Sequence, residues 1–164
     1  MSTKNLSEFD KDSIPSAEGM KFGIVVAEWN PEITDSLKDG AKKTLIDLGA
    51  KEKDIIIKRV PGTFELSLAG QWMAEYTEVN AVILLGCVIQ GETRHFDFIC
   101  QSVTKGTTEL GMKYNKPFIF GVVTAQNQQQ ALDRSGGKLG NKGDEAAVAA
   151  IKMISLKEEL KEMK

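Results

Sequence analysis

Short apolar segments alternate with longer amphipathic ones along this chain of 164 residues, and that alternation restricts the possible fold more than any other feature. Four apolar segments are compact and rich in branched side chains, as expected of strands that are buried on both faces of a sheet. These predicted strands are Phe22–Ala27, Asp54–Val60, Ala81–Leu85 with an extension towards Ile89, and Pro117–Val123. Each is followed by a segment with helical spacing, so the sequence predicts a repeated strand–helix unit.

The first amphipathic segment carries clear helical signals. Pro31 after Asn30 is typical of a first helical turn, apolar residues then recur at helical spacing, and Gly49 ends the pattern. Further helices are predicted from Phe64 to about Tyr76, over Thr93–Tyr114, over Asn127–Arg134, and from a glycine-rich loop (SGGKLGNKG) through Ala147, Ile151 and Ile154. Strands and helices in this order imply right-handed crossovers, so we predict one three-layer αβα domain of the α/β class with a four-stranded parallel sheet.

The N-terminal residues differ from the rest of the chain. Residues 1–20 are polar and aperiodic, with Pro15 and Gly19 as breakers, so we predict a flexible arm or an edge extension. No internal repeat, low-complexity segment or linker divides residues 21–164. We therefore expect these residues to form a single domain.

Charge and hydropathy exclude several classes of protein. The chain carries 21 Lys and Arg against 23 Asp and Glu, and this balance of −2 gives no electrostatic footprint for nucleic acid or an anionic membrane. No apolar run approaches the roughly 20 residues that span a bilayer, and no secretory signal is visible. Cys87 and Cys100 have neither a CxxC nor a zinc-type spacing. Two isolated thiols are typical of a reducing compartment, so we expect a cytoplasmic protein.

The predicted sheet indicates where a ligand would bind. Ligands of open parallel sheets bind beyond the carboxyl ends of the strands. In this sequence those ends are Trp29–Asn30, Pro61–Glu65, Gln90–His95 and the segment after Thr124. The polar, aromatic and glycine residues that could take part in chemistry are concentrated at these junctions, although loops are polar in any protein.

Aromatic and acidic residues at the junctions have two possible roles each. Trp29, Phe64 and Phe120 offer flat faces on which a heterocycle could stack, but such aromatics also serve as plain core residues. Glu65 could accept hydrogen bonds from a polyol, or it could simply satisfy a helix dipole. The residues alone leave both roles open.

The junction after the third strand has the residues expected of a phosphate site. Gly91 allows a tight turn, and a helix predicted to begin at Glu92 or Thr93 would present unpaired N–H groups to an anion. Both residues could equally be no more than helix caps. His95, the only histidine, could transfer a proton beside such a site or could be an exposed helical residue without a role.

Two cations later in the chain form a second candidate cluster. Arg134 could bind phosphate with its planar fork, and Lys142, in the glycine-rich loop, could add a mobile charge. Both could also be solvated cations near a helix end. The P-loop, dinucleotide-binding, zinc-protease, serine-hydrolase and EF-hand motifs are missing, so a nucleoside triphosphate, a metal ion and a serine-hydrolase mechanism have no support.

Four longer motifs occur in an order and spacing typical of one enzyme family. They are FGIVVAEWN at 22–30, VPGTFEL at 60–66, GCVIQGETRHFDFIC at 86–100 and PFIFGVVTAQNQQQALDRSGGKLGNKGDEAA at 117–147. Over about residues 21–156 the chain resembles the 6,7-dimethyl-8-ribityllumazine synthases. The resemblance implies a flavodoxin-like strand order, 2-1-3-4.

The resemblance implies a transferase of riboflavin biosynthesis that joins 5-amino-6-(D-ribitylamino)uracil to 3,4-dihydroxy-2-butanone 4-phosphate. The amine attacks the ketone to form an imine, phosphate is eliminated, and ring closure with loss of water gives 6,7-dimethyl-8-ribityllumazine. Members need no metal ion and no organic cofactor, which agrees with the missing motifs. The alternatives are a non-catalytic flavin or lumazine carrier and a purely structural shell protein on the same fold.

The resemblance also implies residues for the pyrimidine and ribityl site. Trp29, where many members have Phe, would stack on the pyrimidine ring beside Asn30, and Glu65 would hold ribityl hydroxyls. The site would be completed by Thr63, Phe64, backbone groups of Cys87, Val88 and Ile89, and Phe120 from the adjacent subunit.

The implied phosphate site lies at the later junctions. The butanone phosphate would meet the helix-end N–H groups of Glu92 and Thr93, opposite Arg134. His95 would act as the proton shuttle, and Lys142 would be a second cation near the phosphate. The role of Arg94, between these residues, is left open.

The resemblance finally implies an assembly with active sites between subunits. The segment between Arg134 and Asn141 is short and lacks the histidine-rich insertion of some pentameric members, which favours a closed shell of twelve pentamers, a 60-mer, over an isolated pentamer. Residues from about 8 to 16 would add a strand to a neighbour's sheet. Riboflavin synthase is an expected protein partner.

Overall fold

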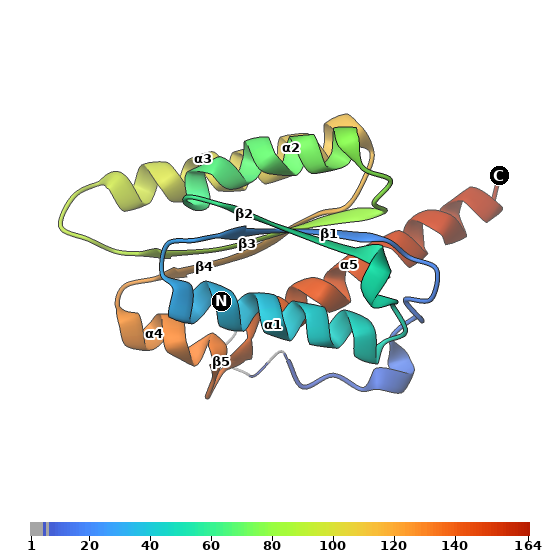
Figure 1. The fold of residues 1–164 in the computed structure, drawn as a ribbon, viewed down its shortest axis with the longest axis horizontal. Helices are drawn as coiled ribbons and strands as arrows, with labels where there is room; N and C mark the ends of the chain where they lie inside the picture. Colours follow the sequence, from blue (N-terminus) through green and yellow to red (C-terminus); the bar gives the residue numbers. More distant parts are fainter. Residues whose placement is uncertain (1–4, 6) are drawn as a thin grey trace.

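A four-stranded parallel sheet forms the centre of the computed structural model, which describes residue 5 and residues 7–164 (Figure 1). The strands are β1 (Phe22–Ala27), β2 (Ile55–Val60), β3 (Ala81–Ile89) and β4 (Phe118–Ala125). Their order is β2-β1-β3-β4, so the predicted α/β class, the parallel sheet and the strand order are confirmed. Residues 1–4 and 6 of the predicted arm lie outside the described residues.

Helices cover both faces of the sheet (Figure 1). One face packs against α1 (Pro31–Asp47), the short α4 (Gln128–Asp133) and α5 (Lys142–Glu162), and the other against α2 (Leu66–Tyr76) and α3 (His95–Tyr114). Among the described residues, 3-10 turns also occur at Lys11–Ser13, Glu52–Asp54 and Thr63–Glu65. None of the helices that the structure describes combines the length and the apolar character needed to cross a bilayer.

The two inner strands send alternate side chains into two cores. On β1, Ile24 and Val26 face α1 and α5, whereas Val25 and Ala27 face α2 and α3, and all four are fully buried. The same alternation holds along β3. Burying one Val, Leu, Ile or Phe side chain contributes roughly 1.5–3 kcal/mol. Strands covered on both faces therefore need the nearly continuous apolar sequence that the chain shows.

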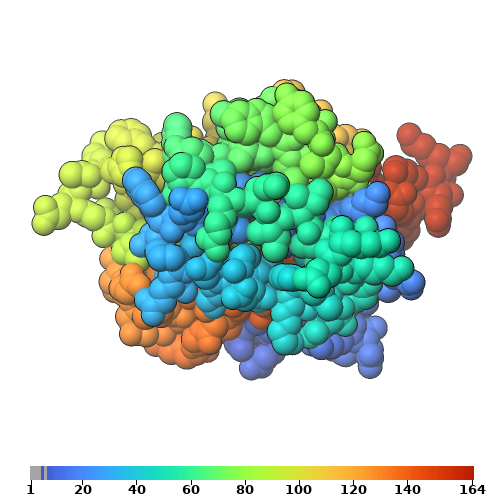
Figure 2. All heavy atoms as spheres, viewed as in Figure 1, coloured from blue at the N-terminus to red at the C-terminus, as the bar shows by residue number. Residues whose placement is uncertain are grey.

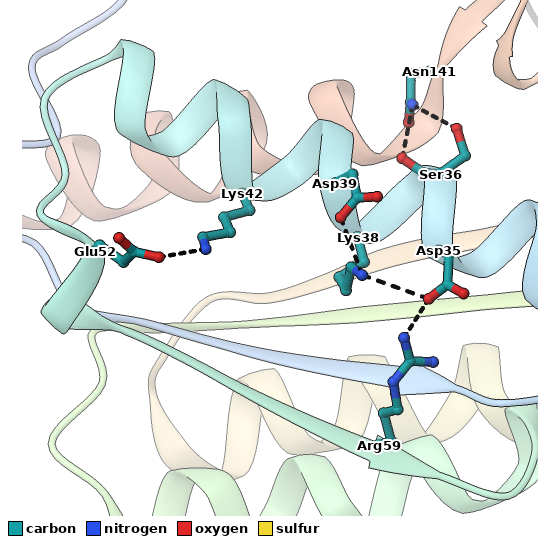
Figure 3. Close-up of polar contacts among 8 residues, drawn as sticks. All are labelled: Asp35, Ser36, Lys38, Asp39, Lys42, Glu52, Arg59 and Asn141. Carbon is teal, nitrogen blue, oxygen red and sulfur yellow. Dashed lines mark hydrogen bonds and ion pairs between the residues drawn. The ribbon is translucent and has the colours of Figure 1, made fainter.

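The edge strand β2 is half-buried and carries two exposed cations. Lys58 and Arg59 point to solvent on this strand, and cations on an edge discourage unwanted pairing with other chains. Arg59 donates to Asp35 of α1, which also pairs with Lys38 (Figure 3). The Arg59 guanidinium holds the pKa of Asp35 below its usual range. Such exposed pairs add little to stability individually.

The third helix begins later than its sequence pattern predicts. α3 starts at His95, because Arg94 occupies the N-cap position, with φ −72° and ψ 7°. Glu92 and Thr93 therefore precede the helix, and the prediction of a start at one of them is wrong by two or three residues. The free N–H groups of the first turn belong to residues after Arg94.

The predicted glycine-rich loop is also more ordered than expected. It contains an antiparallel pair, β5 (Ser135–Gly137) and β6 (Gly140–Asn141). Gly136 and Gly140 adopt φ of 108° and 82°, which glycine tolerates without strain, so the chain can return within a few residues. α5 begins directly after this pair, so Lys142 is the first residue of a helix. The prediction that Lys142 lies in the loop is wrong.

The described part of the arm lies along its own domain. Ile14 and Ala17 are buried in the core that α1 and α5 form. The Ala17 amide donates to the Leu48 carbonyl at 2.8 Å, and the Ser7 hydroxyl both donates to and accepts from the backbone of Asn141. The predicted flexibility of the arm and its pairing with a neighbour's sheet stay predictions.

Candidate active site at the carboxyl end of the sheet

The carboxyl ends of β1 and β3 mark the place where the chain changes from one face of the sheet to the other. β1 leads into α1 on one face, and β3 leads into α3 on the opposite face (Figure 1). We use the word crevice for the region between the ends of these two strands, because ligands of such folds bind there. The predicted site residues at 29–30 and 87–89 lie on the two sides of this crevice.

Strand β3 extends past the end of its neighbour. The last register pair between the two strands joins Val26 to Leu85, and β3 then continues to Ile89. Among the described residues no strand pairs with the β1 side of β3 beyond Leu85. The backbone groups of residues 87–89 on that side are therefore placed to bind the edge of a planar ligand.

The Cys87 carbonyl joins three segments at the crevice. It accepts a hydrogen bond from Asn30 Nδ2 at 3.2 Å and another from Thr63 Oγ1 at 3.4 Å. Asn30 is held in a left-handed conformation, φ 58° and ψ 57°, which asparagine adopts more readily than most residues. These contacts fix the ends of β1 and β2 against β3, so the structure brings Asn30, Thr63 and Cys87 together.

The Cys87 thiol is directed away from the crevice. It lies in the core beside α1 and α5, and burial raises its pKa to about 12. Burial also raises the pKa of Cys100, with a smaller effect from the charge of Asp97. Neither thiol is therefore a nucleophile at neutral pH.

Two large aromatic side chains are uncovered beside this hydrogen-bonded group. Trp29 is 67% exposed and Phe64 is 56% exposed. The Trp29 ring lies 3.7 Å from the position that a Cβ on Gly62 would occupy, an ordinary contact distance, so the indole packs over the Gly62 turn. Glu65 is exposed beside them, and one of its carboxylate oxygens accepts from the Gly62 amide at 3.0 Å.

Phe120 lies elsewhere in the single chain. It pairs with Leu84 on β3, whereas Cys87 pairs with Val123, so Phe120 is three strand residues, or about 10 Å, from the carboxyl end of the crevice. Its half-buried ring packs on the α2 and α3 side of the sheet. The structure therefore does not bring Phe120 to Trp29 within one subunit, and its predicted role in a neighbour's pocket stays a prediction.

The connection from β3 to α3 is exposed from Gln90 to His95. It projects at the left of Figure 1 and stands out from the body of the molecule in Figure 2. Thr93 Oγ1 accepts from the His95 amide at 3.4 Å. Arg94 turns back to its own helix, where it pairs with Asp97 at 3.5 Å and lies 5.8 Å above the centre of the Phe98 ring.

The backbones of the two predicted cationic residues, Arg134 and Lys142, adjoin. Arg134 ends α4 and is half-buried, and its carbonyl accepts from the Lys142 amide at 2.8 Å. The Lys142 ammonium pairs with Glu145 Oε2 at 2.8 Å. Because α4 follows β4 and the segment 90–94 follows β3, all these groups belong to the carboxyl end of adjacent strands (Figure 1).

Two supporting residues of the cation cluster were missed by the sequence analysis. The Asn141 side chain accepts from the Gly143 amide at 2.8 Å and donates to the Ser36 carbonyl at 3.0 Å, which anchors the start of α5 on α1 (Figure 3). Ser36 also donates to the Ser135 carbonyl. Asparagine followed by acidic residues in the first turn is a helix-start signal that could have found Asn141.

Metal-ligating side chains do not gather at this site. Within residues 5 and 7–164, no three His, Cys, Asp or Glu side chains are close enough to hold one metal ion. The described groups offer instead hydrogen-bond donors and acceptors, flat aromatic faces, one imidazole and two cations. Such a set can orient a planar polar molecule beside an anionic one.

Comparison with known proteins agrees with this arrangement. Residues 19–158 match the family described as 6,7-dimethyl-8-ribityllumazine synthase. A protein of that name from Cytophaga hutchinsonii is 59% identical over 152 residues, which are 93% of this chain and 95% of that protein. One from Parabacteroides distasonis is 55% identical over the same shares. One from Flavobacterium johnsoniae is 52% identical over 156 residues, 95% of this chain and 82% of that protein.

The match therefore covers nearly the whole sheet and all the candidate residues at its carboxyl end. The relatives are similar over most of their own length as well, so the likeness is not confined to one motif. The chain belongs to the 6,7-dimethyl-8-ribityllumazine synthase family.

Proposed function

We propose that this chain condenses 5-amino-6-(D-ribitylamino)uracil with 3,4-dihydroxy-2-butanone 4-phosphate to 6,7-dimethyl-8-ribityllumazine. The reaction releases one phosphate and two water molecules. The observation that carries the proposal is the hydrogen bonding of Asn30 and Thr63 to the Cys87 carbonyl at the end of β3, beside the exposed Trp29 ring. A carrier protein is disfavoured, because it would need no separate cation cluster beside that crevice.

The pyrimidine substrate is assigned to the crevice itself. Its ring would stack on Trp29, and its polar edge would meet backbone groups of Cys87, Val88 and Ile89, which extend beyond the end of β1. Phe64 and Glu65 lie after β2, where the ribityl chain would run, and the free lone pairs of Glu65 can accept from hydroxyl groups. Phe120 of an adjacent subunit would cover the ring.

The butanone phosphate is assigned to the later strand ends. Amide groups around Glu92 and Thr93 would bind the phosphate opposite the Arg134 guanidinium, with Lys142 nearby. Preorganised donors of this kind stabilise the charge that develops as phosphate leaves. His95 would take the proton from the attacking amine and return it during elimination. Much of the rate would come from holding the two reactants together, because imine formation is intrinsically easy.

Assembly into pentamers is supported by an apolar stripe, here called the α2 stripe, that runs along α2 and the 3-10 turn before it. Phe64, Leu68, Trp72 and Tyr76 follow one another at a spacing of four residues and are 51–79% exposed. A contiguous apolar surface of this kind is typical of a protein interface. The short β5–β6 connection is consistent with a shell of twelve pentamers. Riboflavin synthase as a partner and a cytoplasmic location are further parts of the proposal.

Mixing the two substrates with the purified protein tests the proposed activity. We expect the absorbance of the lumazine to appear together with one equivalent of inorganic phosphate. Arg134→Ala should slow turnover more than His95→Ala, since the guanidinium holds the departing charge while proton transfer can be taken over by water. If Arg134→Ala were harmless, the phosphate assignment would be lost, and without lumazine formation the activity itself would be refuted.

A further inference from the structure

The ion pair between Lys142 and Glu145 differs from the other pairs on the same helix. Glu145 Oε2 lies 2.8 Å from Lys142 Nζ, and the Glu145 side chain is only 11% exposed. Its second oxygen, Oε1, is buried and has no hydrogen-bond partner. A charged carboxylate is rarely buried with an unsatisfied oxygen, so a simple solvated helix pair does not explain this residue.

The neighbouring acidic residue does not share this position. Asp144 is turned to α1, where it bonds to Thr44 and lies over Gly40. Glu145 is therefore the carboxylate that neutralises Lys142. The Lys142 amide is bonded to the Arg134 carbonyl, so the backbones of the two cationic residues adjoin.

A phosphate site in this enzyme has to satisfy two opposed demands. It must hold the phosphate ester of the substrate, and it must then release the inorganic phosphate made by the same reaction. Two cations without a counter-ion would bind that anion tightly and slow its departure. A carboxylate bonded to one of them lowers the net positive charge that the product meets.

We propose that Glu145 is the counter-ion of Lys142 and that it weakens the binding of inorganic phosphate at the active site. Glu145 does not touch the substrate and acts only through Lys142, so it is a positioning residue. The proposal rests on the proposed function, because that function places phosphate beside Arg134 and Lys142.

Titration calorimetry of inorganic phosphate into the full-length protein tests the proposal. Glu145→Gln removes the charge and keeps the shape of the side chain. We expect it to tighten the dissociation constant by about threefold or more, the size expected when one partly screened charge is removed. Damage to the site would weaken phosphate binding instead. Binding that is unchanged or weaker in a folded Glu145→Gln protein overturns the proposal.

Two further variants identify the route of the effect. Glu145→Asp keeps the negative charge, so its dissociation constant should stay within about twofold of the natural protein. Lys142→Met combined with Glu145→Gln removes both charges of the pair, so its dissociation constant should lie within about twofold of that of the natural protein. Glu158→Gln is the matched control, because Glu158 pairs with Lys161 of the same helix at 2.8 Å but is largely exposed. Tightening in Glu158→Gln, or a double variant that binds phosphate as tightly as Glu145→Gln alone, contradicts the proposal.

A second measurement tests the proposal even if the Glu145→Gln variant fails to fold. Because Lys142→Met leaves Glu145 without its counter-ion, this variant should weaken the phosphate dissociation constant about threefold or more, whereas Arg134→Met should weaken it about tenfold. Unchanged phosphate binding in a folded Lys142→Met protein overturns the proposal. Lumazine formation measured on the same natural protein tests the proposed function separately, since the calorimetry does not depend on turnover.

Discussion

Trp29 is the residue on which the assignment of the heterocycle site depends most. It is two-thirds exposed and lies at the end of β1, beside the Cys87 carbonyl group. Trp29→Phe keeps a stacking surface, so we expect nearly unchanged kinetics. Trp29→Ala should raise KM for the ribitylaminouracil about tenfold, because stacking and burial are both lost.

The other substrate is the internal control for Trp29→Ala. Steady-state kinetics with each substrate varied in turn should show KM for the butanone phosphate within about twofold of the natural value, since the ring does not contact it. A larger rise for the butanone phosphate than for the pyrimidine would place Trp29 at the wrong half of the site.

Asp144 makes stability depend on pH in a defined direction. Burial between α1 and α5 raises its pKa from the ordinary value of 3.8. The folded state then binds more protons than the unfolded state between the two pKa values, so the contribution of this carboxyl to stability falls as pH rises through that window. At neutral pH the ionised Asp144 is destabilising.

Asp144→Asn removes this charge and keeps an acceptor for Thr44. We expect the variant to melt at a higher temperature than the natural protein at pH 7, with the difference vanishing below about pH 3, where Asp144 is protonated in both states. Melting curves by circular dichroism over that pH range measure it. The same gain at all pH values would exclude the charge as its cause.

The sequence predicted the residues at the strand ends better than the residues that contact and position them. Trp29, Asn30 and Thr63 lie at the carboxyl end of the sheet, as predicted, because the carboxyl end of a parallel strand is a defined place; their roles at the site stay predictions. Glu145 was missed, since a Lys and a Glu three positions apart are typical of any solvated helix and nothing in the sequence shows that Glu145 is buried.

At the scale of elements, the buried parts were predicted best. The bounds of β1 match the prediction residue for residue, and β2 begins one residue late because a 3-10 turn takes Asp54. The β5–β6 pair was missed, because it is short and its sequence has no apolar pattern typical of a strand. It depends instead on a few backbone hydrogen bonds and on the positive φ of Gly136 and Gly140. The start of α3 was predicted too early because its N-cap residue, Arg94, makes no side-chain capping hydrogen bond and so gives no start signal in the sequence.

The crossing of α1 and α5 depends on Gly143. A Cβ at this position would lie 1.9 Å from the Leu37 carbonyl oxygen, so the helices would have to move apart. We expect Gly143→Ala to lower the free energy of unfolding by about 2–3 kcal/mol, measured by urea denaturation.

Gly111 provides the matched control in α3. A Cβ there meets its nearest atom at 3.6 Å, an ordinary contact. Because alanine is the better helix former, Gly111→Ala should raise the free energy of unfolding by up to about 1 kcal/mol. Equal losses in the two variants would show that close packing at Gly143 is not the cause.

For the whole molecule, the surface that one subunit leaves uncovered is the main feature. The α2 stripe is exposed, and the second half of α5 projects beyond the sheet at the right of Figure 1, with Leu156 and Leu160 uncovered. Such surfaces are typical of subunits that assemble. The sequence could not show the stripe as exposed, because the same spacing is expected of a helix face packed in the core.

Trp72→Glu tests the stripe as an assembly surface. A charge in the middle of an apolar interface carries a large desolvation cost, so we expect the variant to sediment as smaller species at the same concentration. Lys51→Glu, on an exposed turn far from α2 in the sequence, is the control and should leave sedimentation unchanged. If Trp72→Glu sedimented like the natural protein, α2 would not be part of the interface between subunits.

A crystal structure of the assembled protein soaked with inorganic phosphate tests the account most directly. We predict one phosphate within about 3 Å of both the Arg134 guanidinium and a backbone amide at the start of α3, with the His95 ring beside it. The account would be contradicted if these groups lay on opposite sides of the assembly, with no common anion between them even when neighbouring subunits are included.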